Sequence, residues 1–113
     1  MATVQLTFDP ETLERKAEEV ASMLRAIANP RRLVILCRLV EQGEATPTML
    51  AADVALSQPA LSQHLAKMRA EGLVTYRREG QTLRYRIADK RLERLFAILH
   101  DEFCQPDATA SQE

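Results

Sequence analysis

Two groups of side chains in this 113-residue sequence could do chemistry: the polar residues of segment 57–73 and a pair of cysteines. The segment reads SQPALSQHLAKMRAEGL and carries amides, hydroxyls and cations, which can meet base edges and phosphates in the major groove of DNA. The cysteines, Cys37 and Cys104, are two thiols that an oxidant can join where their backbones come close enough. Both groups need rigid elements to position them, and the remaining patterns predict those elements.

Segment 57–73 has the signals of a single helix. Ser57 can cap its start, Pro59 falls in the first turn, and Gly72 supplies a stop. A short helix around residues 48–53 is expected to precede it, and two such helices joined by a tight turn are typical of a helix-turn-helix. The alternative is the solvated polar face that any amphipathic helix has. The buried side is predicted from apolar residues at helical spacing, Leu61, Leu65 and Met68.

After Gly72 the period of the pattern changes to two, which predicts a β-hairpin. Leu83, Tyr85 and Ile87 alternate with polar residues in segment 82–87, as in a strand with one basic face. Segment 73–78 can pair with it across a turn at residues 79–81. A hairpin directly after a recognition helix is a wing, and arginines on its outer face are expected to reach backbone phosphate or the minor groove.

The net charge of −1 does not indicate a nucleic-acid ligand, but the distribution of charge does. Segment 57–91 has eight Lys and Arg residues against three acidic residues, a net charge of +5, whereas the rest of the chain carries −6. A local basic surface on a neutral chain fits a phosphate footprint, and a solvated run of charge is the alternative.

Three further helices are predicted outside the helix-turn-helix and the hairpin. The first begins at Asp9-Pro10, and the second, over residues 31–40, is apolar nearly all round and ends before Gly43, so it is expected in the core. The last spans residues 89–104. A small core with a hairpin cannot readily cover the apolar stripes of both terminal helices, which favours packing against a second copy of the chain. Those stripes are Leu13, Ala17, Val20, Leu24 and Ile27 on the first helix, and Leu92, Leu95, Phe96, Leu99 and Phe103 on the last.

Length predicts a single domain over residues 1–113, with residues 9–104 ordered and a polar tail at 105–113 expected to be disordered. No secretory signal or membrane-spanning run is present, so a cytoplasmic protein with reduced cysteines is expected. The sequence lacks a CxxC near a βαβ pattern, a glycine-rich phosphate loop, HExxH and GxSxG. We therefore expect that the protein is not an enzyme and has no cofactor and no catalytic residue. A dithiol oxidoreductase is the less favoured alternative.

Four motifs, LRAIANPRRLVILCRL, LSQPALSQHL, EGLV and REGQTLRYRI, give the chain its resemblance to the ArsR/SmtB family of winged-helix repressors. The resemblance covers about residues 13–104. It implies a mainly α-helical winged helix-turn-helix of order α-α-α-α-β-β-α and a homodimer that releases an inverted-repeat operator when a ligand or modification arrives. At matching positions, Gln58, Ser62 and Gln63 would contact bases or the groove, whereas His64 neighbours the apolar stripe and is either packed or reading DNA. The expected DNA-binding residues are Ser57, Gln58, Ser62, Gln63, His64, Lys67, Arg77, Arg78, Gln81 and Arg84.

Neither common metal site of the family is intact in this sequence, so no metal is expected. Where arsenic and cadmium sensors carry a cysteine pair, this chain reads EATPTML, and the last helix has His100 and Asp101 without the HxxH of zinc and nickel sensors. Cys37 and Cys104 are instead similar to the dithiol branch, the BigR/SqrR/HlyU-like sensors of reactive sulfur and oxidants. Two alternatives stay open: Cys37 as a buried small hydrophobe, and a zinc or copper site of His100, Cys104 and Cys37, with or without Asp101.

Overall fold

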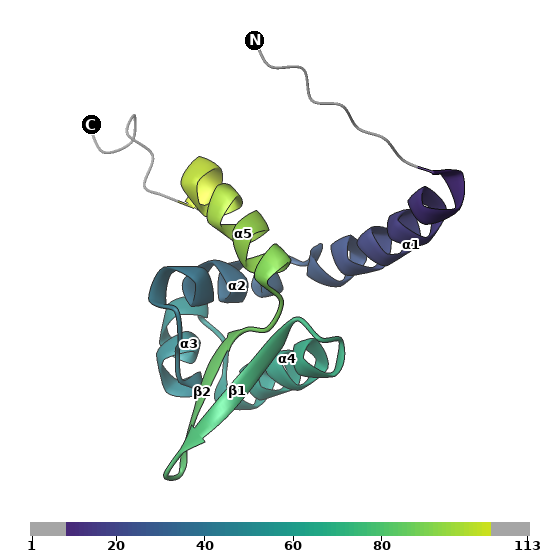
Figure 1. The fold of residues 1–113 in the computed structure, drawn as a ribbon. Coiled ribbons are helices and arrows are strands. Elements are labelled where there is room, and N and C mark those ends of the chain that lie inside the picture. The colour runs from purple at the N-terminus through teal and green to yellow at the C-terminus, as the bar shows by residue number, and fades with distance from the viewer. Residues whose placement is uncertain (1–8, 105–113) are drawn as a thin grey trace, which may run out of the picture.

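The computed structural model describes residues 9–104. Helices and strands follow the predicted order and form a winged helix-turn-helix (Figure 1). Within the described residues none of the helices is long and apolar enough to cross a membrane. The elements are α1 (Pro10–Ile27), α2 (Pro30–Gln42), α3 (Pro47–Val54), α4 (Gln58–Ala70), β1 (Val74–Glu79), β2 (Thr82–Ile87), α5 (Lys90–Leu99) and the π-helical segment η1 (His100–Cys104).

Local capping explains where the helices begin and end. The side chain of Asn29 accepts hydrogen bonds from the backbone N–H groups of Arg31 and Arg32, and Pro30 follows it at the first helical position. Helix α2 then continues until Gly43, whose φ of 79° suits glycine. The helix is therefore longer at both ends than the predicted 31–40. Asp9, Thr46, Ser57 and Asp89 cap α1, α3, α4 and α5 in the same way.

The turn between α3 and α4 fixes the geometry of the helix-turn-helix. Ala55 adopts a left-handed conformation with φ 55°, and Ser57 then caps α4 by accepting from the N–H of Ala60 at 3.2 Å. Arg31 of α2 donates from Nη1 to the carbonyl oxygen of Val54 at 3.0 Å, which satisfies a group at the end of α3. Helix α2 thus holds the end of α3 from which the chain enters α4.

The wing is an antiparallel hairpin whose turn is shorter than predicted. Glu79 pairs with Thr82, so the connection has two residues, Gly80 and Gln81, rather than the expected three. Gly80 has φ 64°, which fits the two-residue turns that match the twist of paired strands. A single residue before α3, Ala45, extends the sheet by exchanging backbone hydrogen bonds with Tyr85 at 3.0 and 2.9 Å.

One cluster of buried side chains joins α2, α3, α4, α5 and the hairpin. Helix α2 lies at its centre and contacts α3, α5 and β2. The expectation that α2 is buried nearly all round is only partly confirmed, because Leu33 and Val34 are exposed. The side chains that lie fully inside the cluster include Ile35, Leu36, Leu39, Leu50, Leu61, Leu65, Met68, Leu92 and Phe96.

The two terminal helices leave apolar surface uncovered. Helix α1 projects away from the other elements (Figure 1), and three members of its stripe, Leu13, Val20 and Leu24, are 44–47% exposed. At the other end of the chain the helix changes to π-helical geometry after Leu99. Phe103 is then 79% exposed, which agrees with the expectation that one copy of the chain does not cover the whole stripe, whereas Leu92 and Phe96 of the same stripe are buried.

Candidate nucleic-acid interface and cysteine site

Helix α4 presents the predicted polar face to solvent. Leu61, Leu65 and Met68 are buried, as expected, and this fixes the rotation of the helix. His64 lies between the two faces and is half-buried, which agrees with its position beside the apolar stripe. The exposed residues on the outer side are Ser57, Gln58, Ser62, Gln63 and Lys67.

Aromatic contacts fix the angle between α4 and the wing. The guanidinium of Arg69 lies 4.3 Å from the centre of the Tyr76 ring, as in a cation–π contact, and the rings of Tyr76 and Tyr85 lie 5.3 Å apart. Burial raises the pKa of the Tyr85 hydroxyl, and the Tyr76 hydroxyl adds to the shift. Arg69 therefore connects α4 to β1, a role that the spacing of residues in α4 alone did not predict.

Two of the predicted wing arginines are paired with carboxylates. Arg77 donates to both oxygens of Glu44 at 2.9 to 3.1 Å and from Nη1 to Glu79, and Arg84 donates from Nε to Glu79 at 3.1 Å. Hydrogen bonds from Arg77 lower the pKa of both carboxyls, and they raise the pKa of Arg77 itself. These pairs are exposed, so a DNA phosphate can compete with the carboxylates for the arginines.

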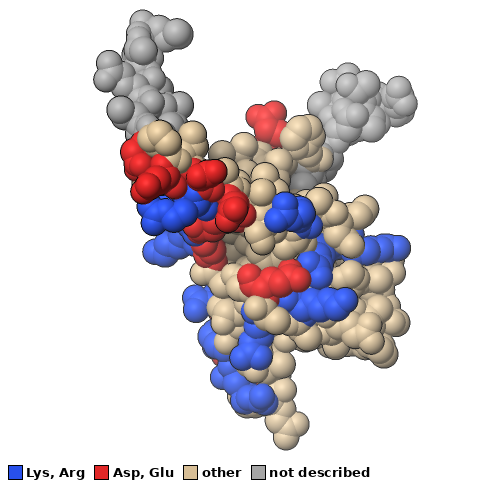
Figure 2. Space-filling model, turned by 90° about the vertical axis from the view of Figure 1, so that its right-hand side faces the viewer, with Lys and Arg blue, Asp and Glu red and all other residues tan. Residues whose placement is uncertain are grey.

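The outermost wing residues stay accessible. Arg78 and Gln81 are exposed, and within residues 9–104 Arg78 makes no ion pair. In the view of Figure 2, Lys and Arg gather in the lower part of the molecule, at the height of α4 and the wing in Figure 1, whereas most Asp and Glu lie higher. The charge asymmetry predicted from the sequence is therefore also an asymmetry in space. A cationic surface of this kind attracts a polyanion.

Of the two predicted thiols, the structure describes the side chain of Cys37 only. Cys37 lies in α2 with 8% of its surface exposed, and it is disulfide-bonded rather than free. Cys104 closes η1, but its side chain lies outside the described part of the structure. Helix α2 contacts η1, and His100 Nε2 lies 2.6 Å from Glu41 Oε2. Because Glu41 follows Cys37 by one turn and His100 precedes Cys104 by one turn, this contact holds the two cysteine-bearing elements together.

Metal ligands do not cluster in the described residues. No group of three or more His, Cys, Asp and Glu side chains within residues 9–104 has the arrangement to hold a metal ion. Within that range His100 faces Glu41 and lies 3.8 Å from Asp101 through Nδ1. The alternative set of His100, Cys104 and Cys37 includes the Cys104 side chain, which lies outside the described part of the structure, so this set stays a prediction.

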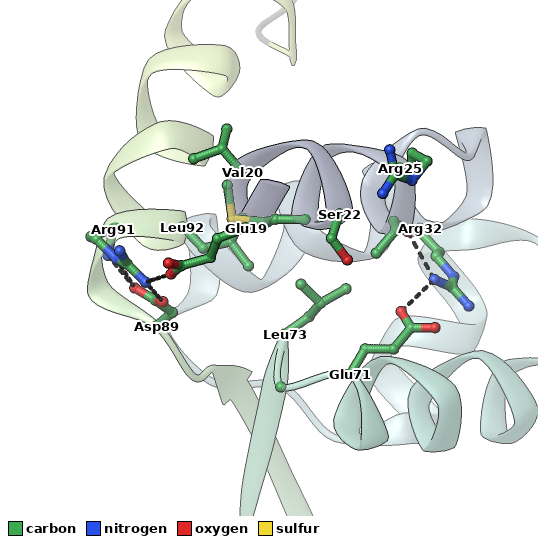
Figure 3. Close-up of a pocket in the computed structure, with 13 residues that line it drawn as sticks. Glu19, Val20, Ser22, Arg25, Arg32, Glu71, Leu73, Asp89, Arg91 and Leu92 are labelled. Carbon is green, nitrogen blue, oxygen red and sulfur yellow. Dashed lines mark hydrogen bonds and ion pairs between the residues drawn. The ribbon is translucent and has the colours of Figure 1, made fainter. Parts of the chain in front are cut away.

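A hollow of about 770 Å³ separates α1 from the junction of α4 and β1 and from the start of α5 (Figure 3). Leu73 lines it on the side of the hairpin. Arg91 of α5 reaches Glu19 of α1 at 3.2 Å across one end, while across the other Arg32 donates to Glu71 at 2.9 Å and to the Ala26 carbonyl oxygen at 2.8 Å. Exposed ion pairs such as that of Arg91 with Glu19 add little stability, so this pair contributes little to the attachment of α1.

Sequence reasoning missed the carboxylate partners of Arg77 and His100. Glu44 lies 33 positions before Arg77, and Glu41 lies 59 positions before His100. No local period relates residues so far apart, because their approach depends on how α2 packs against the hairpin and η1. The alternation of segment 82–87 did predict that Arg84 lies opposite the buried face.

Comparison with known proteins places these features in a family. Residues 29–76 match the family described as bacterial regulatory proteins, arsR family. The biofilm growth-associated repressor of Agrobacterium fabrum is 40% identical over 84% of this chain and 80% of its own length. The transcriptional activator HlyU of Vibrio cholerae is 39% identical over 84% of this chain and 87% of its own.

Solved structures agree with the fold. A predicted DNA-binding transcriptional regulator from E. coli superimposes with a TM-score of 0.80 and 35% identity, covering 84% of this chain and all of that one. A homodimeric winged helix-turn-helix DNA-binding domain from Mycobacterium bovis has a TM-score of 0.68 and 34% identity, covering 84% of this chain and 87% of that one. The winged helix-turn-helix and the family resemblance expected from the sequence are thereby confirmed.

Proposed function

The chain belongs to the ArsR family of bacterial regulatory proteins, and on that premise we propose that it represses transcription as a homodimer on an inverted-repeat operator. The operator is bound while the thiols are reduced and is released when Cys37 and Cys104 are bridged by reactive sulfur or an oxidant. Its role is regulatory rather than catalytic, and binding to the chromosome places it in the cytoplasm. The observation that carries the sensing proposal is that buried Cys37 is bonded while its helix contacts η1.

The exposed face of α4 supports the DNA-binding part of the proposal. Gln58, Ser62 and Gln63 are the residues assigned to base edges, since amides and hydroxyls can donate and accept there. Ser57, His64 and Lys67 on α4, with the wing residues Arg77, Arg78, Gln81 and Arg84, are assigned to phosphate or groove contacts. The two arginines that already bind carboxylates can exchange Glu44 and Glu79 for phosphate.

Uncovered apolar surface supports the dimer. Leu13, Val20 and Leu24 of α1 and Phe103 of η1 are all exposed in one copy, and burying them against a second copy removes this apolar area from water. A two-fold dimer places two α4 helices about one turn of DNA apart, which is the geometry that an inverted repeat requires.

The sensing chemistry joins Cys37 to the one other cysteine in the chain, Cys104. One thiolate attacks the central sulfur of a polysulfide HS–S–SH and expels hydrosulfide. The second thiolate attacks the same sulfur and expels another hydrosulfide, which leaves Cys–S–S–S–Cys. The thiols are oxidised by two electrons and the polysulfide is reduced. A direct disulfide, formed with an oxidant that takes up the same two electrons, links the same elements.

Intact-mass spectrometry combined with an operator-release assay tests the proposal. The reduced homodimer is treated separately with polysulfide, peroxide and a disulfide reagent, and Cys37→Ser is the control variant. We expect wild type to gain sulfur between its cysteines and release the operator, while Cys37→Ser binds the operator and holds it under polysulfide. Release by the variant would overturn the dithiol switch, and retention of stoichiometric zinc by wild type would select the metal site instead.

A further inference from the structure

A series of polar and charged side chains connects η1 to α3 through α2. His100 contacts one oxygen of Glu41 at 2.6 Å, and the other oxygen of Glu41 accepts a hydrogen bond from Arg38. Arg38 also donates from Nε to Asp53 of α3 at 3.0 Å, and this hydrogen bond is the main cause of its raised pKa. We call these four residues the relay. Their side chains are 20–34% exposed, so water shields their contacts only partly.

The relay begins beside the cysteines and ends beside the turn into α4. Arg38 directly follows Cys37, and His100 lies one turn before Cys104. At the other end Asp53 directly precedes Val54, the last residue of α3, whose carbonyl is bound by Arg31 of the same α2 helix. Arginines of α2 therefore hold the end of α3 at two adjacent residues, and only one of these two contacts continues to η1.

We propose that the relay transmits the bridged state of the cysteines to the recognition helix, an inference that rests on the proposed dithiol switch. Bridging draws η1 onto α2 and brings His100 to Glu41. Glu41 then divides its oxygens between His100 and Arg38, which sets how Arg38 holds Asp53 and therefore the position of α3. The four side chains are positioning residues, because none of them reacts. Charge-assisted hydrogen bonds in series suit this role, since each depends on its neighbour.

A double-mutant cycle between the two ends of the relay tests the proposal, because Asp53 and His100 are joined only through Arg38 and Glu41 in the described contacts. The measured quantity is the ratio of operator affinities of the reduced and polysulfide-treated homodimer. We expect Asp53→Asn and His100→Gln each to lower this ratio by about tenfold. The double variant should fall no further than the more affected single variant, since both changes interrupt one series of contacts.

The controls separate transmission from bridging and from folding. Arg94→Ala removes an exposed arginine of α5 that makes no ion pair within residues 9–104, and it should keep the wild-type ratio. Mass spectrometry should give the same bridged product in every variant, and reduced-state operator affinity should report intact folding. Arg38→Lys keeps the positive charge but loses the planar guanidinium that binds two carboxylates. It provides a second test in which Asp53 and His100 are both left unchanged.

The possible outcomes distinguish failure of the relay from failure of the dithiol switch on which it rests. A wild-type protein that ignores polysulfide would overturn the dithiol switch and the relay together. A responsive wild type whose two single variants keep the full ratio, or whose effects simply multiply in the double variant, would overturn the relay alone. If Arg38→Lys still forms the bridge but its reduced and polysulfide-treated forms bind the operator with similar affinity, the relay is supported.

Discussion

At the scale of single residues, Gln63 offers the clearest test of base recognition. It lies on the exposed face of α4, on the side away from Leu61 and Leu65. We expect Gln63→Ala to reduce discrimination between the operator and a sequence with one changed base pair by about 1–3 kcal/mol, because a side-chain amide is lost from a base edge. Fluorescence anisotropy on both duplexes measures this. Gln42→Ala, an exposed change at the end of α2, is the control, and unchanged discrimination in Gln63→Ala would remove the assignment.

Arg84 and its carboxylate partner give opposite expectations for the wing. Arg84→Ala should lower affinity for every DNA sequence and reduce the slope of log affinity against log salt by about one, because one phosphate contact is lost. Glu79→Gln should strengthen binding to all sequences, since Arg84 then gives up no ion pair to reach phosphate and Arg77 gives up only its pair with Glu44. A salt titration of both variants checks the two signs. A loss confined to the operator would mean that Arg84 reads sequence instead.

At the scale of elements, features that depend on neighbouring residues in the sequence were predicted well, and features that depend on packing were not. The cap at Ser57 and the stripe of Leu61, Leu65 and Met68 correctly predicted α4, because each signal lies within the helix. The hairpin turn was predicted to begin one residue too early, at Glu79. Glu79 can lie in a strand or in a turn, and the positive φ of Gly80 makes Gly80 the first residue of the turn. The change to π-helical geometry at η1 has no signal in the alternation of apolar residues.

Asp89 at the start of α5 makes the stability of the folded protein depend on pH. It accepts from the N–H of Arg91 at 2.7 Å and from its guanidinium at 2.9 Å, and these hydrogen bonds lower its pKa from 3.8 to about 2. A carboxyl whose pKa is lower in the folded state stabilises it fully above the unfolded pKa. That stabilisation should be lost as the pH falls from about 4 to about 2. Thermal unfolding across this range measures it.

Two substitutions separate the contribution of Asp89 from general acid effects. Asp89→Asn keeps an oxygen that can cap α5 but carries no charge, so its melting temperature should depend less on pH between about 4 and about 2 than that of wild type. Glu93→Gln changes a carboxylate of the same helix that makes no ion pair within residues 9–104, and it should keep the wild-type dependence. Equal pH profiles for Asp89→Asn and wild type would contradict the assignment.

At the scale of the whole molecule, charge and apolar surface are separated. Most basic residues of segment 57–91 lie on α4 and the wing (Figures 1 and 2), whereas α1, α5 and η1 carry most of the exposed large apolar side chains and the others lie on α2 and α3. Counting charges along the sequence predicted the first of these surfaces. The stripes of the terminal helices predicted the second, but only the structure shows that α1 projects from the core. A molecule arranged in this way can bind DNA with one surface and a second copy with the other.

Leu24 provides the test of that second surface. It is 47% exposed on the same side of α1 as Leu13 and Val20, so a charge placed there would be buried between copies. We expect Leu24→Glu to raise the dissociation constant of the dimer by about tenfold or more, measured by analytical ultracentrifugation. Operator affinity should fall with it and recover at high protein concentration, because each copy holds one half-site. Ser22→Glu adds the same charge roughly 160° around the same helix and should leave both quantities unchanged. A Leu24→Glu protein that dimerises normally would place the interface elsewhere.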